Sequence, residues 1–239
     1  MKDPLHLGFV VLLLGAGMAY SAQTAKLTRA GVWTGGAVGL FLFLGCGWLG
    51  VGLITLFFVL GSGATSWKRA EKRQLGLVDQ DHGPRTAGQV LANAGVAGLL
   101  GTLAWLIPAV APLAPLLVAG SFAAATADTL SSELGNVYGR RYYHVLTGRP
   151  DRRGENGVVS LEGTLLGLAG SALVAAVYCL ASGWGPAFGW LLVAGTAGNL
   201  ADSVLGATLE RRGYVGNNAV NAVNTLVGAL TAGGLAALS

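Results

Sequence analysis

The sequence is short of charge. Only 11% of its 239 residues are Asp, Glu, Lys or Arg, whereas soluble domains carry about 25%. It has two cysteines, Cys46 and Cys179, and three scattered histidines, His6, His82 and His144. This spacing argues against a zinc site, and both cysteines are expected to be small buried apolar residues. The chain also lacks a glycine loop followed by Lys-Ser or Lys-Thr, which excludes a P-loop.

In place of charge, the chain has long apolar segments. Hydrophobic residues make up 53% of it, and 39 residues are Gly. A spanning helix needs about 20 mostly apolar residues. We therefore expect an all-α, polytopic membrane helix bundle in a single domain over 1–239, with N-terminal helices at 5–64 and site-bearing helices at 86–237. The expected spans lie near 5–22, 30–46, 48–64, 86–106, 111–134, 158–181, 187–208 and 216–237.

The number of spans depends on the second and third, which are separated only by a Gly-Cys-Gly turn. Eight helices are expected if they are separate, and seven if they merge or re-enter. We interpret residues 7–20 as part of a first transmembrane helix rather than a cleavable signal peptide, because the charged region before them is weak.

Basic residues alternate between loops. They occur at Lys26 and Arg29, in the loops 65–85 and 136–157, and at Arg211 and Arg212, whereas loops 107–110 and 182–186 have none. The positive-inside rule then places the basic loops in the cytoplasm. We expect the plasma (inner) membrane of a prokaryote. The basic loops either set the topology and contact anionic lipid, or also attract a polyphosphate substrate.

Three carboxylates interrupt the apolar spans. Each costs roughly 2.5–3.5 kcal/mol at the bilayer centre, so Asp128 and Asp202 are the first candidates for function. Glu133 lies about 140° around the helix from Asp128 and near its end. The segment Ala127-Asp-Thr-Leu-Ser is similar to Ala201-Asp-Ser-Val-Leu, and each precedes a basic loop and a polar helix. This favours an internal repeat in the C-terminal half that brings two acidic helices to one site.

Polar residues recur at helical spacing near the same ends of the spans. Any one of them could only stabilise helix packing, but together they predict one cytoplasmic cavity walled by the fourth to eighth helices. The catalytic candidates are Asp128, Asp202 and Arg85, and the metal candidates are Asp128, Glu133 and Asp202. The candidates for binding substrate or nucleotide are Asn93, Ser131, Arg141, Arg153, Glu155, Asn156, Ser160, Glu162, Asn199, Asn218, Asn221 and Asn224.

This set of side chains suits a phosphate reaction. Mg²⁺ prefers one or two carboxylates together with phosphate oxygens, and arginine binds phosphate through two parallel hydrogen bonds. Phosphoryl transfer needs positioning and charge neutralisation more than covalent catalysis. We therefore expect Mg²⁺ as cofactor, a nucleoside triphosphate and a membrane lipid as partners, and no nucleic acid.

Five ordered motifs carry a family resemblance. Residues 85–93, 127–135, 154–163, 198–207 and 217–225 together resemble the integral membrane family that includes the chloroplast phytyl-phosphate kinase and many uncharacterised bacterial and archaeal members. The resemblance implies a Mg²⁺-dependent kinase that uses a nucleoside triphosphate, with CTP favoured, to convert an isoprenyl (phytyl or polyprenyl) monophosphate into the diphosphate. The Asp128 and Ser160–Gly163 segments resemble CTP-dependent membrane kinases and cytidylyltransferases more weakly.

Three other functions fit the same residues. A cytidylyltransferase would form a CDP-lipid and release pyrophosphate. An ion-coupled transporter or flippase would use the carboxylates to bind its coupling ion, and internal repeats are common in transporters. A purely structural membrane protein would use the polar residues only for packing.

Overall fold

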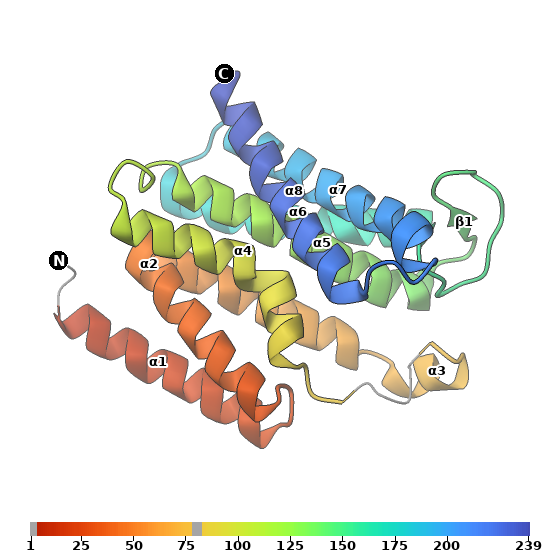
Figure 1. The fold of residues 1–239 in the computed structure, drawn as a ribbon, viewed down its shortest axis with the longest axis horizontal. Helices are drawn as coiled ribbons and strands as arrows, with labels where there is room; N and C mark the ends of the chain where they lie inside the picture. Colours follow the sequence, from red (N-terminus) through yellow and green to blue (C-terminus); the bar gives the residue numbers. More distant parts are fainter. Residues whose placement is uncertain (1–3, 78–82) are drawn as a thin grey trace.

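The structure is a computed structural model that describes residues 4–77 and 83–239. It is a bundle of helices (Figure 1), and the all-α expectation is confirmed. Part of the expected loop 65–85, including His82, lies outside the described residues. The long helices are α1 (Pro4–Gln23), α2 (Arg29–Ser66), α4 (Ala87–Leu106), α5 (Ala114–Tyr138), α6 (Leu161–Ser182), α7 (Ala187–Leu205) and α8 (Asn217–Ala237). Between them lie α3 (Arg69–Gln74), the antiparallel strands β1 (Tyr143–His144) and β2 (Val158–Val159), and the π-helical turn η1 (Gly206–Glu210).

Helix α2 folds back on itself. Gly47 has φ 65° and ψ −148° inside its 38 residues, a backbone conformation open to glycine and almost closed to other residues. Lys26, just before α2, donates a 2.7 Å hydrogen bond from Nζ to Oγ of Ser66 at its far end. The two halves are therefore the expected spans 30–46 and 48–64, and the described residues form eight long helical segments.

Five helices are long and apolar enough to cross a membrane by length and composition, namely α1, α2, α4, α6 and α8. Helices α5 and α7 are not among them, although they have 25 and 19 residues. These are the two helices that carry the carboxylates Asp128, Glu133 and Asp202. Most residues of α5 are buried by other helices, whereas only four residues of α7 are buried.

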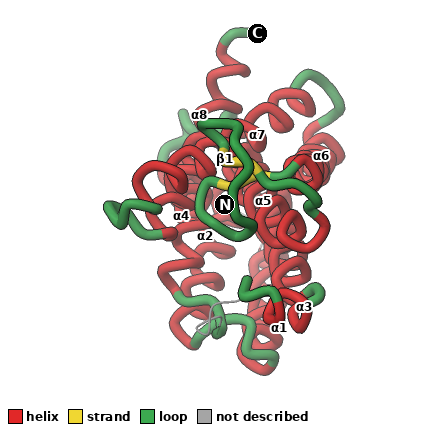
Figure 2. The backbone as a smooth tube through the Cα atoms, turned by 90° about the vertical axis from the view of Figure 1, so that its right-hand side faces the viewer, coloured by secondary structure: helices red, strands yellow, loops and turns green. Residues whose placement is uncertain are grey.

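Helix α5 lies at the centre of the bundle, in contact with α2, α4, α6, α7 and α8 (Figures 1 and 2). Residues 118–127 are all buried, and most are Ala, Gly, Ser or Thr. Small residues let helix backbones approach closely within a membrane. At the contact with α8, a Cβ added to Gly120 would lie 2.6 Å from the carbonyl oxygen of Gly228. This close packing holds the backbone around Asp128 against several neighbouring helices.

Helices α5 and α7 meet through corresponding residues of the expected repeat. The carboxyl groups of Asp128 and Asp202 lie within hydrogen-bonding reach of each other. In the same alignment Ala124 corresponds to Gly198, and a Cβ on Gly198 would clash with the Cβ of Ala124. Contact between matching positions is what a two-fold relation between units produces. The packing therefore agrees with an internal repeat of α5–α6 and α7–α8.

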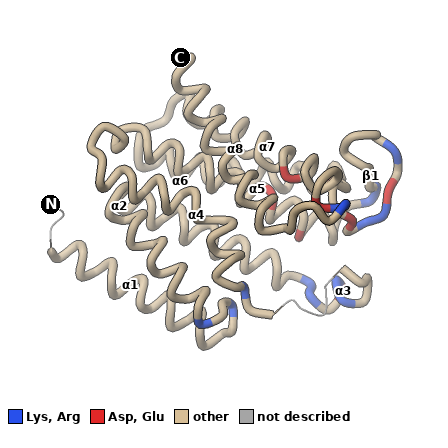
Figure 3. The backbone as a smooth tube through the Cα atoms, in the orientation of Figure 1, with Lys and Arg blue, Asp and Glu red and all other residues tan. Residues whose placement is uncertain are grey.

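Lysine and arginine gather at one end of the bundle, which we call the basic end (Figure 3). Its loops are tied together across the sequence. The backbone N–H of Arg85 donates to the carbonyl of Lys26 at 2.9 Å, and Thr28 N–H donates to the carbonyl of Arg85 at 3.0 Å. Arg211 pairs with Asp151 at 2.8 Å. These contacts hold the loops over the helix ends that carry the candidate site.

Candidate functional site

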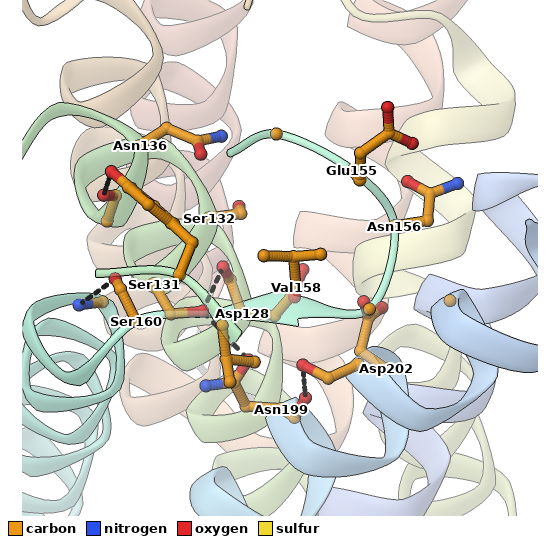
Figure 4. Close-up of a pocket in the computed structure, with 18 of the residues that line it drawn as sticks. Asp128, Ser131, Ser132, Asn136, Glu155, Asn156, Val158, Ser160, Asn199 and Asp202 are labelled. Atoms are coloured by element: carbon orange, nitrogen blue, oxygen red, sulfur yellow. Dashed lines mark hydrogen bonds between the residues drawn. The ribbon is translucent and has the colours of Figure 1, made fainter. Parts of the chain in front are cut away.

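A cavity of about 170 Å³ lies between the basic ends of α5, α6 and α7. We call it the carboxylate cavity, because four carboxylates and no lysine or arginine are among its described lining residues. Figure 4 shows the loop of Glu155 and Asn156 facing Ser131 and Asn136 across it. Its lining residues are Asp128, Ser131, Ser132, Gly135, Asn136, Tyr142, residues 154–160, Gly163, Thr164, Asn199, Asp202, Ser203, Gly206, Glu210 and Asn217.

Local hydrogen bonds fix the walls of this cavity. Ser131 Oγ on α5 donates to Asn199 Oδ1 on α7 at 2.9 Å, which links the two acidic helices. Ser160 caps α6 by accepting the Gly163 N–H at 3.1 Å. Gly157 has φ +78° and packs directly on Ala207, so the loop passes close to η1 only because this residue has no side chain. The loop, α6 and η1 thus present their polar groups to Asp128 and Asp202.

The carboxylate cavity fits a divalent cation. The carboxyl groups of Asp128 and Asp202 are hydrogen-bonding neighbours. Two negative charges this close repel each other, so the pair needs either a shared proton or a bound cation. Among the described residues, the buried Oδ2 of Asp202 has no hydrogen-bond partner. The volume of about 170 Å³ lies below the roughly 300–1,000 Å³ of ordinary ligand sites, so it suits a hydrated ion better than a whole nucleotide.

The donor set also fits magnesium better than zinc. Within residues 4–77 and 83–239 no group of three or more His, Cys, Asp or Glu side chains could hold a metal ion. Mg²⁺ is usually bound by one or two carboxylates with waters and substrate phosphates, rather than by an all-protein cage. The residues that could hold it are Asp128 and Asp202.

A second, larger cavity of about 510 Å³ lies beside the first. We call it the cationic cavity, because Lys26, Arg69 and Arg85 line it. The guanidinium of Arg85 donates from Nη2 to Thr65 Oγ1 on α2 at 3.1 Å. Burial lowers the pKa of Arg85 from its ordinary value, and the charge of Glu133 opposes this shift. The other lining residues are Thr24, Ala25, Ser62, Thr65, Ser66, Gly83, Pro84, Thr86, Gln89, Asn93, Asp128, Thr129, Ser132, Glu133, Asn217 and Asn221.

Glu133 has a basic partner that the sequence analysis did not foresee. Lys72 on α3 is only 3% exposed, and its Nζ lies 2.6 Å from Glu133 Oε2 and 2.8 Å from the carbonyl of Ala64. The predicted metal ligand Glu133 is therefore engaged in an ion pair that docks α3 onto α5. It lines the cationic cavity and not the carboxylate cavity with Asp202.

The two cavities meet at Asp128. This residue, Ser132 and Asn217 are the lining residues that both share. Because Lys72 neutralises Glu133, Asp128 is the other carboxylate on the cationic side. A negatively charged ligand in the larger cavity and a cation in the smaller one would therefore lie on either side of one side chain.

The structure brings most of the predicted residues to these cavities. Arg85, Asn93 and Asn221 line the cationic cavity, with Asn221 Nδ2 donating to Asn217 Oδ1 at 2.8 Å. The carboxylate cavity receives Ser131, Glu155, Asn156, Ser160 and Asn199 in addition to the two aspartates.

Five predicted residues lie outside both cavities. Arg153 donates from Nε to the Tyr142 hydroxyl at 2.7 Å, and Glu162 accepts from the Arg140 N–H at 3.4 Å. Asn224 is fully buried in the contact of α8 with Gly198 and lines neither cavity, but its side-chain amide lies within hydrogen-bonding reach of the Asp202 carboxyl. The other two are exposed, Arg141 in the loop and Asn218 at the start of α8. Helical spacing placed Asn224 on the correct face but could not give its depth.

The sequence analysis missed the contribution of the N-terminal helices. Lys26, Ser62, Thr65, Ser66 and Arg69 all line the cationic cavity. Lys26 was interpreted as a topology signal and Arg69 as part of a basic loop that sets topology or also attracts a polyphosphate, but neither was assigned to a site, and the hydroxyl residues had no motif around them. Only the packing of the returning half of α2 against α5 brings them to the site.

Comparison with known proteins agrees with this fold. Residues 10–229 match the model of a family described as integral membrane protein DUF92. The chain belongs to this family. The match covers the helices and loops that form both cavities, and it confirms the family resemblance carried by the five motifs.

Relatives of the chain occur in bacteria, archaea and plants. An uncharacterised membrane protein of Synechocystis is 31% identical over 230 residues, which are 92% of this chain and 86% of the relative. Protein VTE6, chloroplastic, of Arabidopsis thaliana is 30% identical over 238 residues, 97% of this chain and 70% of the relative. An uncharacterised membrane protein of Methanocaldococcus jannaschii is 31% identical over 239 residues, 93% of this chain and 91% of the relative. No solved structure matches.

Proposed function

We propose that this chain is a Mg²⁺-dependent membrane kinase that phosphorylates an isoprenyl monophosphate to the diphosphate. The donor is a nucleoside triphosphate, with CTP favoured. The observation that carries the proposal is the junction of a carboxylate cavity and a cationic cavity at Asp128. Transfer between two phosphates requires a site that both holds a cation and neutralises anions. The isoprenoid acceptor follows from the motifs that resemble the family of the chloroplast phytyl-phosphate kinase.

The chemistry needs no strong base. An oxygen of the acceptor monophosphate is already an anion, and it forms a bond to the γ-phosphorus while the bond from that phosphorus to the β–γ bridging oxygen breaks. A nucleoside diphosphate leaves with the electron pair of that bond. Asp128 and Asp202 would hold Mg²⁺, which when bound would supply positive charge to the phosphate oxygens.

The chain's own residues orient the reaction. The Ser131–Asn199 hydrogen bond fixes α5 against α7 and so fixes the separation of the two aspartates. Arg85 is held by backbone pairing to Lys26 and by Thr65, which preorganises its charge before an anion enters. The Asn156–Gly157 loop forms one wall of the carboxylate cavity.

The proposed orientation places the basic end in the cytoplasm of a prokaryotic cell, where nucleoside triphosphates occur. The gathering of Lys and Arg at this end supports it (Figure 3). A cysteine introduced at Arg149 in the exposed loop should react with an impermeant maleimide in inside-out vesicles and not in intact cells. The opposite labelling would refute this orientation.

The test of the activity uses purified protein in nanodiscs with phytyl phosphate, Mg²⁺ and γ-labelled CTP. We expect labelled phytyl diphosphate and CDP. Asp128→Asn should lower kcat by at least about 100-fold, the effect of removing one group that stabilises transferring charge. The matched control is Glu71→Gln, because this exposed carboxylate lies outside both cavities and the variant should retain activity.

Other outcomes identify the competing functions. Release of pyrophosphate with formation of a CDP-lipid would replace the kinase by a cytidylyltransferase. Full activity of Asp128→Asn would remove the junction of the cavities from the reaction. Ion-dependent uptake in proteoliposomes without nucleotide turnover would identify a transporter.

A further inference from the structure

We propose that the two cavities divide the substrates, and that the cationic cavity is the site of the acceptor phosphomonoester. This inference rests on the proposed kinase function, since it assigns that reaction's acceptor to Lys26, Arg69 and Arg85. The carboxylate cavity then receives the cation and the donor phosphates that carry it, while the rest of the nucleotide stays outside this small cavity. No motif in the sequence pointed to Lys26 or Arg69 as ligand-binding residues.

The charges of the cavities carry the first step. The carboxylate cavity presents Asp128, Asp202, Glu155 and Glu210, and of these only Glu155 has a basic partner, Arg211 at 3.8 Å, among the described residues. A phosphate that enters without a cation is repelled there. A nucleoside triphosphate normally carries Mg²⁺ on its β- and γ-oxygens, so it enters with the charge that the carboxylates need.

The cationic cavity has the opposite balance. Over the described part of the chain, neither Lys26 nor Arg85 has a carboxylate within 4.0 Å. Lys26 Nζ and Arg85 Nη2 are instead held by the hydroxyls of Ser66 and Thr65, which orient the charges without neutralising them. A monophosphate can bind such a site directly, through charge-assisted hydrogen bonds, and needs no metal ion.

Size and position carry the second step. The cationic cavity of about 510 Å³ falls within the 300–1,000 Å³ of ordinary ligand sites, whereas the carboxylate cavity does not. Its walls come from the loop after α1, from the C-terminal end of α2, from α3, and from α4, α5 and α8, so it lies between the N-terminal helices and the central helix. An acceptor whose chain runs between these helices would have its phosphate at Arg85.

Asp128 carries the third step, because it borders both cavities. An anion at Arg85 and a cation at Asp202 would approach each other across this residue, with Ser132 and Asn217 beside it. The two substrates therefore bind in separate cavities, and their phosphates meet at Asp128. Lys26 is a binding residue for the acceptor and takes no part in holding the donor.

Direct binding tests this division without relying on turnover. The probe is geranylgeranyl monophosphate, added to wild-type protein in nanodiscs with excess EDTA, and its Kd is measured by calorimetry. We expect binding to persist in EDTA. Lys26→Ala should raise this Kd by about tenfold to a hundredfold, the effect of losing a hydrogen bond to a charged group. Arg29→Ala is the matched control, since it removes a like charge three residues away from an exposed position outside the cavity.

The donor provides the reciprocal measurement. Binding of a non-hydrolysable CTP analogue should require Mg²⁺, should be weakened at least about tenfold in Asp202→Asn, and should be unchanged in Lys26→Ala. Inorganic phosphate separates a lipid site from a general phosphate site. Equal Kd values for inorganic phosphate and the isoprenyl ester would refute the lipid assignment.

The outcomes distinguish this inference from the kinase proposal. If the monophosphate binds in EDTA through Lys26 but no diphosphate forms with any donor, the kinase proposal fails and the cavity assignment stands. If diphosphate forms but acceptor binding needs Mg²⁺, or is lost in Asp202→Asn and intact in Lys26→Ala, the kinase stands and the division of substrates is refuted.

Discussion

The buried ion pair between Lys72 and Glu133 gives the sharpest prediction for stability. Lys72 is 3% exposed and Glu133 is 23% exposed, with their charged atoms 2.6 Å apart. Removing one partner of a buried pair costs about 3–5 kcal/mol, because the other charge stays buried without compensation. Since Glu133 is partly exposed to the cavity, we expect a smaller cost than this range, about 2–3 kcal/mol, for Lys72→Met or Glu133→Gln.

The assay is a double-mutant cycle on the free energy of unfolding, measured by denaturant titration in detergent micelles. The double variant Lys72→Met/Glu133→Gln should be more stable than the sum of the two single effects predicts, by about 1–2 kcal/mol. The control pair is Lys68 and Glu71 on the same short helix, 3.1 Å apart but 42% and 46% exposed. Its removal should cost less than about 1 kcal/mol.

The same variants test the role of Glu133. If it serves the ion pair and holds no metal, Glu133→Gln should leave the Kd for Mg²⁺ and nucleotide within about threefold of the wild-type value once stability is allowed for. Strictly additive unfolding energies would refute the coupling of Lys72 and Glu133. A loss of Mg²⁺ affinity in Glu133→Gln as large as in Asp202→Asn would refute the conclusion that Glu133 holds no metal.

Two further predictions concern the loop over the carboxylate cavity. Gly157→Ala should weaken Mg²⁺-dependent nucleotide binding at least about tenfold, because its φ is +78° and the new Cβ meets Ala207. The control is Gly148→Ala, where φ is +64° but the space is open. That variant bears only the backbone strain of about 1 kcal/mol. Hydrogen bonds from the Arg211 guanidinium and a backbone N–H hold the pKa of Asp151 below its ordinary value. The Arg211–Asp151 contact is therefore fully formed at pH values above the ordinary pKa, and it is lost as the pH falls through the lowered pKa. The protection of backbone amides in loop 139–160, that is their exchange relative to the intrinsic rate at each pH, should therefore be constant from pH 8 to 5 and fall below about pH 4. In Arg211→Ala this protection should already be lost at pH 7, and a profile like that of the wild type would refute the anchoring role.

Apolar length and glycine content were sufficient to predict the bundle. The break between 30–46 and 48–64 was readable because Gly47 lies in a Gly-Cys-Gly turn between two apolar runs. The boundaries of α5 were less accurate, since it continues to Tyr138 through the polar residues that follow Glu133. Helix ends at a membrane surface depend on loop contacts that hydropathy does not contain.

The carboxylate cavity was predictable in outline, because Asp128 and Asp202 carry a cost that only function or pairing can offset. The cationic cavity was not, apart from Arg85, Asn93 and Asn221. Lys26 and Ser66 are 40 residues apart in the chain and meet only where α2 returns. Lys72 was interpreted as loop charge, since no local pattern shows that a lysine on a six-residue helix will be buried.

The central position of α5 has a consequence for how the protein is made. This helix emerges from the ribosome before α7 and α8, yet it is not among the five helices apolar enough to span a membrane by composition. Its polar residues are covered by helices that follow it in the chain, and Asn217 of the last helix completes both cavities. We therefore expect α5 to complete its packing only when the C-terminal helices arrive, so that its stable insertion into the membrane and the assembly of the site are coupled.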